Sequence, residues 1–399
     1  MRRDSTSSLP DDGRPLRVHL VAHHHLDRAA GVSGATLALG RGLAAHGCSV
    51  SYYSFDDAFG TAGGAEIPRM VRFPWLVARH LARTPACDVV DATTGDAWVW
   101  TTLGRRGCTH AALVTRAHGL EHVMSEDVRR RARAGEMQLS RKYPLYHGGY
   151  RLWEVRRSLV ASDAQVFLND VDRAFAVERL GVDAATCVVL PNGVPDRLLD
   201  LAPVEAPRMD GPIELAFLGS WIARKGIAAV VEMASLLHSR DVPFSLRLLG
   251  TGVASDEVRS AFAPEVRDRV SVFPRFEPGE LADRLRGADV LLHPSWTEGF
   301  SLALVEGMAC GLAPVATRSG GSTAVVRDLE TGLLMRDESG GALADAVALL
   351  AADRALLGRM REAAQRAVQP LRWDAIAART IDVYRDALAR RRAIRTLRK

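Results

Sequence analysis

The sequence predicts an α/β fold built from two Rossmann-like domains, and three observations carry this prediction. The chain has 399 residues, which is more than one hydrophobic core usually organises. Short apolar, β-rich runs alternate with amphipathic stretches, which is the pattern of βα units in parallel sheets. Residues 198–212 gather prolines and lose this periodicity, so they are predicted to link two series of such units.

The first domain is expected over residues 15–197. It follows a polar leader, residues 1–14, which lacks the apolar core of a signal peptide and is expected to be disordered. Helical spacing fills the gaps between the apolar runs. The strands of this domain are expected at Leu16–Ala22, Cys48–Phe55, Cys87–Thr93, Ala111–Ala117, Asp163–Asn169 and Thr186–Asn192.

The second domain is expected over residues 213–370, and residues 371–399 form a further amphipathic helical stretch. In open α/β sheets ligands bind beyond the carboxyl ends of the strands. The residues that directly follow each strand are therefore the candidates for a functional site. The strands of this domain are expected at Glu214–Gly219, Ser245–Gly250, Val270–Pro274, Val290–Ser295 and Ala313–Thr317.

Composition is typical of a globular enzyme of the reduced cytoplasm. Apolar residues make up 47% of the chain and charged residues 25%. The five cysteines are an odd number without a C-x-x-C pair, which argues against a disulfide framework and a thiolate zinc site. No run of eighteen apolar residues occurs, so no transmembrane span is expected.

Arginine is concentrated in two segments, VRRRAR at 128–133 and RRRAIRTLRK at 390–399, although the net charge is only +5. One interpretation is a pair of solvated helix faces. The other is peripheral contact with an anionic membrane surface or with a phosphorylated substrate. No aromatic residues interleave with these arginines as a stacking platform would require, so nucleic acid is not an expected partner.

The segment TEGFSLALVEGMACG carries two carboxylates, Glu298 and Glu306, among small or apolar residues. Ser301 is expected to cap a helix that ends near Gly311. Free N–H groups at a helix start form an anion site that needs no metal. At the helical rise, the two carboxylates lie at most about 12 Å apart, the scale of a diphosphate with a sugar on each side. The alternative is a helix that merely carries one glutamate near its dipole and another exposed in its middle.

E-G-F-S-L-A-L-V-E, followed by G-M-A-C-G-L-A-P-V-A-T, closely resembles the E-x7-E segment of retaining glycosyltransferases of the GT-B fold, the family 4 group. The resemblance extends along most of the chain, with several motifs in the family's order. They are the glycine loop and helix at Gly31–Val50, the histidine motif RAHGLEH at Arg116–His122, the turn LPNGV at Leu190–Val194 and the phosphate-binding segment FLGSWIARKG at Phe217–Gly226.

The resemblance implies a GT-B fold, in which two Rossmann-like domains face each other across a cleft. The N-terminal domain would hold the acceptor and the C-terminal domain the nucleotide-sugar donor. The helix of residues 371–399 would cross back to pack on the N-terminal domain. Its apolar anchors would be Trp373, Ile376, Ile381 and Tyr384.

The resemblance also implies the catalytic residues. His118 would lie beside the reacting carbon of the donor sugar, and Gly34 would let the backbone approach the phosphates. Lys225, with Arg224, would neutralise the charge that builds on the leaving diphosphate. Glu298 would hold a hydroxyl of the donor sugar. These residue types suit a reaction in which preorganised donors stabilise developing negative charge.

Further donor contacts are implied at the helix start. The amides of Phe300, Ser301 and Leu302 would face the diphosphate, and Glu306 would hold the nucleotide ribose. An ionised carboxylate accepts hydrogen bonds only, so it suits vicinal hydroxyls. No metal and no cofactor are expected beyond the nucleotide sugar as co-substrate.

Four residues at or after the ends of strands of the first domain are candidate acceptor contacts. They are His24, Asp96, Arg116 and Glu121. For Asp96 a plain capping role stays open, and for His118 a hydrogen-bonded structural role at the end of a strand stays open.

Two positions depart from the family's pattern. Ser220 stands where the family often has an arginine, so the phosphate contact rests on Arg224 and Lys225. The family's G-G-x-P-E loop corresponds to Gly320–Ala324, which lacks both the proline and the glutamate. These departures put the donor contacts of that loop in doubt.

Two other patterns are weak candidates for metal binding. Asp170 and Asp172 match D-x-D, but aspartates at a helix start are the expected partners of its dipole. The three histidines at 23–25 lie near Asp27, and a polar loop that contacts substrate explains them as well.

The leading hypothesis is a metal-independent, retaining glycosyltransferase that moves a sugar from a nucleotide-diphosphate sugar to a hydroxyl acceptor, in glycan or cell-envelope polysaccharide biosynthesis. The acceptor would be a glycan, a lipid-linked molecule or a small molecule. The alternatives are a noncatalytic GT-B subunit that supports a partner transferase, and a GT-B-like nucleotide-sugar epimerase. A dehydrogenase is disfavoured because no G-x-G-x-x-G follows the first strand.

Overall fold

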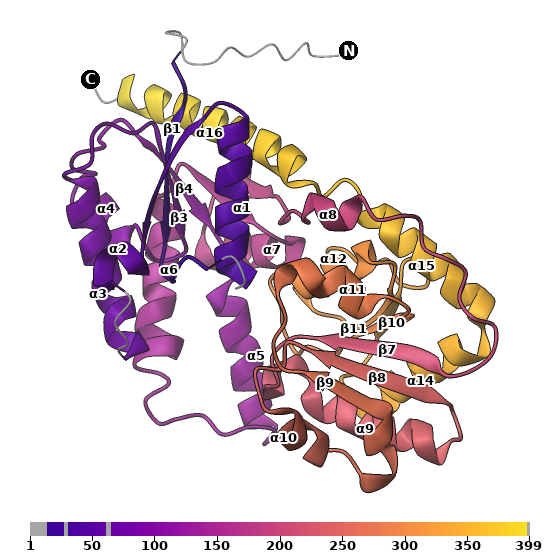
Figure 1. The fold of residues 1–399 in the computed structure, drawn as a ribbon. Helices are drawn as coiled ribbons and strands as arrows, with labels where there is room; N and C mark the ends of the chain where they lie inside the picture. Colours follow the sequence, from indigo (N-terminus) through magenta and orange to yellow (C-terminus); the bar gives the residue numbers. More distant parts are fainter. Residues whose placement is uncertain (1–13, 28–30, 61–64, 397–399) are drawn as a thin grey trace. The chain divides into compact units, whose positions relative to one another are not determined.

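The computed structural model describes residues 14–27, 31–60 and 65–396. The chain divides into two compact units, and it passes between them after Gly193 and again after Arg372. Each unit holds one six-stranded sheet in which all strands are parallel (Figure 1). Residues 198–212, predicted as a linker, all belong to the second unit. The predicted leader lies outside the described residues, except for Arg14.

The sheet of the N-terminal unit has the strand order β2-β1-β3-β4-β5-β6. Its central strands β3 and β4 are buried along their whole length, because helices cover both faces. The strands are β1 (Arg17–Ala22), β2 (Ser49–Ser54), β3 (Val89–Thr93), β4 (Ala112–Arg116), β5 (Ala164–Phe167) and β6 (Cys187–Val189).

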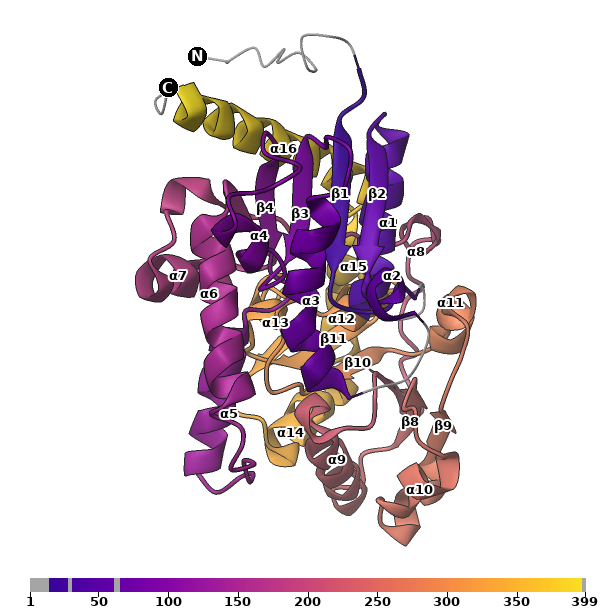
Figure 2. The same cartoon turned by 90° about the vertical axis from the view of Figure 1, so that its left-hand side faces the viewer.

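The two faces of this sheet pack against different helices. The helices of the unit are α1 (Gly31–Ala45), α2 (Phe55–Phe59), α3 (Glu66–Leu81), α4 (Trp98–Thr102), α5 (Glu121–Arg133), α6 (Arg151–Ala161), α7 (Asp170–Leu180) and α16 (Trp373–Thr396). α1 and α16 share one apolar core with β1, β3 and β4. α3 and α4 share another with the opposite face, and Figure 2 shows both helices in front of the strands.

α16 packs on the N-terminal unit, which confirms the expected return of the last helix. Gly42 of α1 allows the close approach, since a Cβ atom there would lie 2.8 Å from the Cβ of Ala377. Ile376, Ile381 and Tyr384 are buried in the core of this unit, and Trp373 packs against them. The Tyr384 hydroxyl donates a 2.6 Å hydrogen bond to Asp91 at the end of β3.

The sheet of the C-terminal unit has the order β12-β11-β10-β7-β8-β9. Its strands are β7 (Ile213–Leu218), β8 (Phe244–Leu249), β9 (Val270–Phe273), β10 (Val290–His293), β11 (Ala313–Thr317) and β12 (Leu333–Met335). Its helices are α8 (Asp196–Leu199), α9 (Ile227–Ser239), α10 (Ser255–Ser260), α11 (Leu281–Leu285), α12 (Leu302–Ala309), α13 (Gly320–Thr323), α14 (Gly340–Ala352) and α15 (Arg354–Val368).

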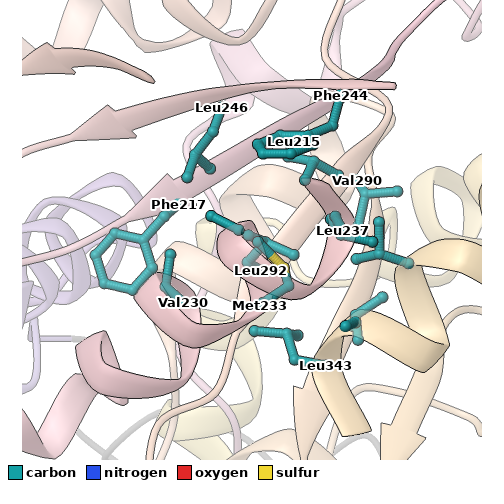
Figure 3. Close-up of a cluster of buried hydrophobic side chains, with 14 of the residues drawn as sticks. Leu215, Phe217, Val230, Met233, Leu237, Phe244, Leu246, Val290, Leu292 and Leu343 are labelled. Atoms are coloured by element: carbon teal, nitrogen blue, oxygen red, sulfur yellow. The ribbon is translucent and has the colours of Figure 1, made fainter. Parts of the chain in front are cut away.

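One face of α9 contributes an apolar stripe to the core of this unit. Val230, Met233 and Leu237 recur at helical spacing on α9, so they form one apolar stripe. Figure 3 shows this stripe against Leu215 and Phe217 of β7. The stripe holds the start of α9, and therefore the loop that precedes it, against the sheet.

Both predicted series of strands are present, with ends that shift by up to three residues. β12 was not predicted, because three apolar residues show no alternation that a strand would require. No helix among the described residues combines the length and apolarity that crossing a bilayer demands. All five cysteines are free thiols.

Candidate active site

The order of the C-terminal sheet reverses between β10 and β7, which pair directly through Leu215 and Val290. Ligands of open α/β sheets bind beyond the carboxyl ends of strands at such a reversal. The loop after β7 leads through a short 3-10 helix, Ala223–Lys225, into α9. The loop after β10 leads into α12. These two loops carry the predicted donor residues.

The two loops are joined by an ion pair. Lys225 Nζ lies 2.6 Å from Glu298 Oε1, and Arg224 Nη1 lies 3.3 Å from the same oxygen. Burial opposes ionisation of Glu298, but the charges of Lys225 and His293 and a hydrogen bond from Lys225 hold its pKa below the usual value. Glu298 is therefore an ionised carboxylate that faces two cations.

Close backbone contacts hold these loops in register. Gly226 has φ +73°, and a Cβ atom there would lie 2.0 Å from the carbonyl oxygen of Pro294. The Trp296 amide donates to the Arg224 carbonyl at 3.0 Å. On the other side, the Gly321 amide donates to the Glu298 carbonyl at 2.8 Å. The loop that lacks the family's proline and glutamate therefore still supports the Glu298 backbone.

The start of α12 has the geometry that the sequence predicts. Ser301 is its N-cap, and its hydroxyl accepts a hydrogen bond from the Leu304 amide at 3.3 Å. Among the described residues, the amides of Phe300, Ser301 and Leu302 donate to no protein acceptor. These amides, with the helix dipole, form an anion site directly after Glu298.

Glu306 lies inside α12 and is half-buried. Its side chain makes no hydrogen bond within the part of the chain that the structure describes. Burial raises the pKa of this carboxyl to about 7, although Arg197 lowers it. A half-buried carboxyl without a hydrogen-bonding partner is typical of a binding or catalytic position.

The N-terminal sheet reverses between β1 and β3, and polar side chains also gather there. His23, after β1, approaches Asp96, after β3, with 2.8 Å between Nδ1 and Oδ1. Thr94 donates to Glu121 at 2.7 Å. Asp96 and Glu121, two predicted acceptor contacts, therefore lie in one polar region at the carboxyl edge of the sheet.

His118 follows β4 and is a neutral imidazole. Burial, followed by the charge of Arg116, holds its pKa well below the usual value. Its Nδ1 atom is buried and has no hydrogen-bond partner among the described residues. His118 also lines a small cavity of about 20 Å³ with Asn192. This volume is enough for one water molecule or one ligand group.

Two other predicted acceptor contacts differ in their surroundings. The guanidinium of Arg116 is buried against Asp91, with 2.8 Å between Nη2 and Oδ2, and Tyr384 donates to the same carboxylate. The charge of Arg116 is therefore already compensated. His24 is half-buried, its Nε2 atom has no partner among the described residues, and burial lowers its pKa to about 4.

Two protein-family models match the chain in succession. The model described as Glycosyltransferase Family 4 matches residues 29–198, and the model described as Glycosyl transferases group 1 matches residues 203–367. The alpha-maltose-1-phosphate synthase of Mycobacterium tuberculosis is 32% identical over 269 residues, which cover 61% of this chain and 68% of that protein. The chain belongs to the GT-B glycosyltransferases of the family 4 group.

Other relatives of this glycosyltransferase are named D-inositol 3-phosphate glycosyltransferases. The one from Arthrobacter sp. is 35% identical over 183 residues, covering 45% of this chain and 44% of that protein. The one from Xylanimonas cellulosilytica is 33% identical over 253 residues, covering 59% and 60%. The matches thus span about half the length of these curated relatives.

Solved structures confirm the GT-B fold of the glycosyltransferase. Sucrose-phosphate synthase from Thermosynechococcus elongatus has a TM-score of 0.75 at 22% identity, covering 94% of this chain and 99% of that chain. WaaG, a glycosyltransferase involved in lipopolysaccharide biosynthesis, has a TM-score of 0.69 at 18% identity, covering 92% and 99%. Anabaena HepE, solved with UDP and glucose, has a TM-score of 0.62 at 15% identity, covering 91% and 98%.

Several features of this glycosyltransferase were not predicted from its sequence. His293 ends β10, and its buried Nε2 atom has no partner among the described residues. Burial lowers the pKa of His293 to about 4. Arg151 of α6 lies in the polar region of the N-terminal unit, where it donates to Glu121 at 2.8 Å. No local pattern marks either residue, because each is one polar residue within an ordinary strand or helix.

The remaining predicted positions are placed as follows. Gly34 lies in the first turn of α1. Asp172 is buried at the start of α7 and accepts a hydrogen bond from the Leu120 amide at 2.9 Å, which gives it a structural role. Within the described ranges, no group of three or more His, Cys, Asp or Glu side chains is arranged to hold a metal ion.

The arginine-rich segments are partly engaged within the protein. In α5, Arg131 is buried and pairs with Asp127 at 3.0 Å and with Glu136 at 2.8 Å. In α16, Arg390 donates to the Ala185 carbonyl at 3.0 Å. Membrane contact through these segments stays a prediction, and residues 397–399 lie outside the described part of the chain.

Proposed function

We propose that this glycosyltransferase moves a sugar, with retention of configuration and without a metal ion, from a nucleotide-diphosphate sugar to a hydroxyl acceptor. One observation carries the proposal. The Lys225–Glu298 pair lies beside the three unbonded amides that precede and open α12, at the reversal of the C-terminal sheet. The cation and the helix start there suit the diphosphate of a sugar diphosphate, and the carboxylate suits a hydroxyl of its sugar.

The protein itself offers the positive charge that a departing diphosphate requires. Lys225 and Arg224 carry two cations, and the start of α12 adds the dipole and its amides. Such preorganised groups stabilise negative charge as it develops, which is often the largest contribution to catalysis. This supports a reaction in which no metal ion is needed. Retention rests on the family resemblance.

The carboxylates would orient the donor. Glu298 is ionised and accepts hydrogen bonds, so it would hold a hydroxyl of the donor sugar. Glu306, eight residues further along the chain and about one turn inside α12, would accept from the ribose hydroxyls. His118 is neutral, so it would donate or accept a hydrogen bond beside the reacting carbon without adding charge.

A uridine diphosphate sugar is the first donor to test, because a structural neighbour was solved with UDP-glucose. The acceptor would be a glycan, a lipid-linked molecule or a small molecule, and the protein would act in the cytoplasm or at the inner face of the membrane. The arginine-rich segments favour a role near the cell envelope.

The proposal is tested by thermal unfolding of the purified chain with UDP, GDP or ADP, in the presence of EDTA. A ligand that binds the folded state raises the melting temperature. We expect one diphosphate to raise it, and the effect to disappear in Glu306→Ala. The matched control is Glu257→Ala, which removes an exposed carboxyl of the same unit. No shift with any diphosphate would contradict the proposal.

A noncatalytic subunit is the second candidate, because Ser220 and Ala324 depart from the family's pattern. Turnover by the purified chain alone, with a donor and an acceptor, would exclude it. Conversion of the donor without any acceptor would instead identify an epimerase.

A further inference from the structure

A cluster of buried ionisable groups lies at the carboxyl edge of the N-terminal sheet, which we call the Arg151 cluster. Its members are His23, Asp96, Glu121, Tyr146, Arg151 and Glu154. Three of them follow the adjacent strands β1, β3 and β4, and the others come from α6 and the π-helical turn that precedes it. This is the place where open α/β sheets bind ligands.

Arg151 is the centre of the cluster. Its Nη2 atom donates to Glu121 at 2.8 Å and to the Thr94 carbonyl at 2.7 Å, and it lies 3.4 Å from His23 Nε2. Gly95, with φ +84°, makes room for the guanidinium, because a Cβ atom there would lie 2.4 Å from Nη1. The turn after β3 is thus shaped around this arginine.

The cluster contains more hydrogen-bonding capacity than the protein uses. Within the described part of the chain, five buried atoms have no hydrogen-bond partner, although two of them, Arg151 Nη1 and Glu154 Oε2, form an ion pair at 3.8 Å. The five atoms are Asp96 Oδ2, Glu121 Oε2, Tyr146 Oη, Arg151 Nη1 and Glu154 Oε2. Asp96 and Glu154 are 1% and 0% exposed, and Arg151 is 5% exposed. Buried polar groups are normally paired, so these atoms indicate that a ligand or water completes the site.

The charges of the cluster decide which ligand fits. Three carboxyl groups face one guanidinium, and burial lowers the pKa of His23 to about 3, so this histidine is neutral. Burial raises the pKa of Asp96 and raises that of Glu154 to about 7. Even with both of these protonated, the cluster carries no net positive charge. The neighbouring guanidinium of Arg116 is compensated by Asp91.

We propose that the Arg151 cluster binds the acceptor and selects a polyol that is uncharged or carries an amino group, and that it disfavours a phosphorylated acceptor. An ionised carboxylate accepts hydrogen bonds and a protonated carboxyl can donate or accept one, so the unbonded oxygens of Asp96 and Glu121 suit hydroxyl or ammonium groups on the ligand. A phosphate group would meet carboxylates and find no uncompensated cation. Several relatives are named for a phosphorylated inositol, so this chain would differ from them in its acceptor.

This inference rests on the proposed function, and its test measures acceptor binding separately from donor binding. Three probes with the same ring are titrated into the full chain and followed by ligand-observed NMR. They are myo-inositol, an amino-substituted inositol and D-myo-inositol 3-phosphate. We expect the phosphate to bind about ten-fold or more weakly than the other two, because like charges repel in a buried site.

Glu121→Gln provides the second measurement. Removing this carboxylate charge leaves the positive charge of Arg151 less compensated. The ratio between the dissociation constants of the phosphate and of the uncharged polyol should therefore shrink several-fold. The matched control is Glu126→Gln on the same helix, where the carboxylate is 58% exposed and pairs only at 3.8 Å with Arg179. The control should leave this ratio unchanged.

The proposal is overturned if the phosphate binds as tightly as myo-inositol, if none of the three probes binds, or if Glu121→Gln leaves their ratio unchanged. In each of these cases a diphosphate that still stabilises the chain would leave the proposed transferase function intact. Loss of diphosphate binding in the unmodified chain would instead contradict the transferase function itself.

Discussion

Lys225 and Glu298 form a 2.6 Å ion pair that joins the ends of β7 and β10, the two strands between which the C-terminal sheet reverses. Glu298 is 11% exposed and Lys225 is 16% exposed, so the pair is largely screened from solvent by the protein. The lysine therefore has a fixed position before any substrate arrives. A positioned cation at this edge is what a departing diphosphate needs.

Replacing Lys225 by methionine should reduce turnover about 10²- to 10³-fold, as loss of one preorganised donor commonly does. The substitution keeps an unbranched side chain that is one atom shorter, and it removes the charge and the hydrogen-bond donors of Nζ. Turnover of the sugar donor measures the effect. Arg240→Met is the control, because it breaks an equally short but exposed ion pair with Asp345 in the same unit. Equal turnover in both variants would refute the role of Lys225.

The raised pKa of Glu306 predicts how stability depends on pH. In the unfolded chain the pKa of this carboxyl is near its ordinary value of 4.5, whereas burial in the folded chain raises the pKa to about 7. The folded state therefore holds the proton more tightly, so this group lowers stability as pH rises from 4.5 to 7. Glu306→Gln should remove that loss. The melting temperature of the variant relative to the unmodified chain should increase from pH 5 to pH 8.

The control for this pH series is Glu257→Gln, which removes an exposed carboxyl. Its melting temperature relative to the unmodified chain should stay level with pH. If the melting temperature of Glu306→Gln relative to the unmodified chain also does not change with pH, Glu306 ionises normally in the folded chain.

Gly321 is expected to be essential for the position of Glu298. A Cβ atom at Gly321 would lie 2.8 Å from the Glu298 carbonyl oxygen and 3.1 Å from the Phe300 Cα. Gly321→Ala should therefore displace this loop, weaken diphosphate binding and destabilise the chain by about 1–3 kcal/mol. Calorimetric titration and denaturation measure the two effects. Gly341→Ala is the control, since the nearest atom to its Cβ is 3.6 Å away.

His118→Ala should reduce turnover about 10²-fold or more and leave diphosphate affinity unchanged, since His118 belongs to the N-terminal unit. The pKa of His118 lies well below the usual value, so His118 should not titrate between pH 6 and 8. The dependence of turnover on pH in this range should therefore have the same shape in the unmodified chain and in the variant. A titration that disappears in the variant would contradict the assignment of a neutral imidazole. His46→Ala, which alters a surface pair with Asp374, is the control.

Tyr384→Phe tests the contact between α16 and the N-terminal sheet. The variant leaves Asp91 and Arg116 buried and removes one 2.6 Å hydrogen bond. Chemical denaturation should show a loss of about 1–3 kcal/mol, because the buried carboxylate loses a donor. Tyr52→Phe is the control, since no described residue hydrogen-bonds its hydroxyl. Equal stability of the two variants would show that the Asp91 contact contributes nothing.

Much of the candidate site in the C-terminal unit could be predicted from the sequence. Ser301 followed by an apolar helical run specifies a capped helix, because the cap and the free amides lie within a few residues of each other. Glu298 and Glu306 are placed by that helix. The pairing of Glu298 with Lys225 is different, since it depends on β7 and β10 becoming neighbours in the sheet.

The sequence by itself determined the two series of strands and the family, because alternation, capping and motif spacing are local properties of the chain, and the family resemblance implied the returning helix. Only the tertiary structure decided the neighbours of Arg116 and Arg151. Asp91 and Tyr384 compensate the first from a distant strand and the last helix. The second is one arginine in an ordinary helix until folding surrounds it with two carboxylates and a histidine that follow three different strands. Contacts between residues so far apart depend on how the elements pack, and no short pattern records that packing.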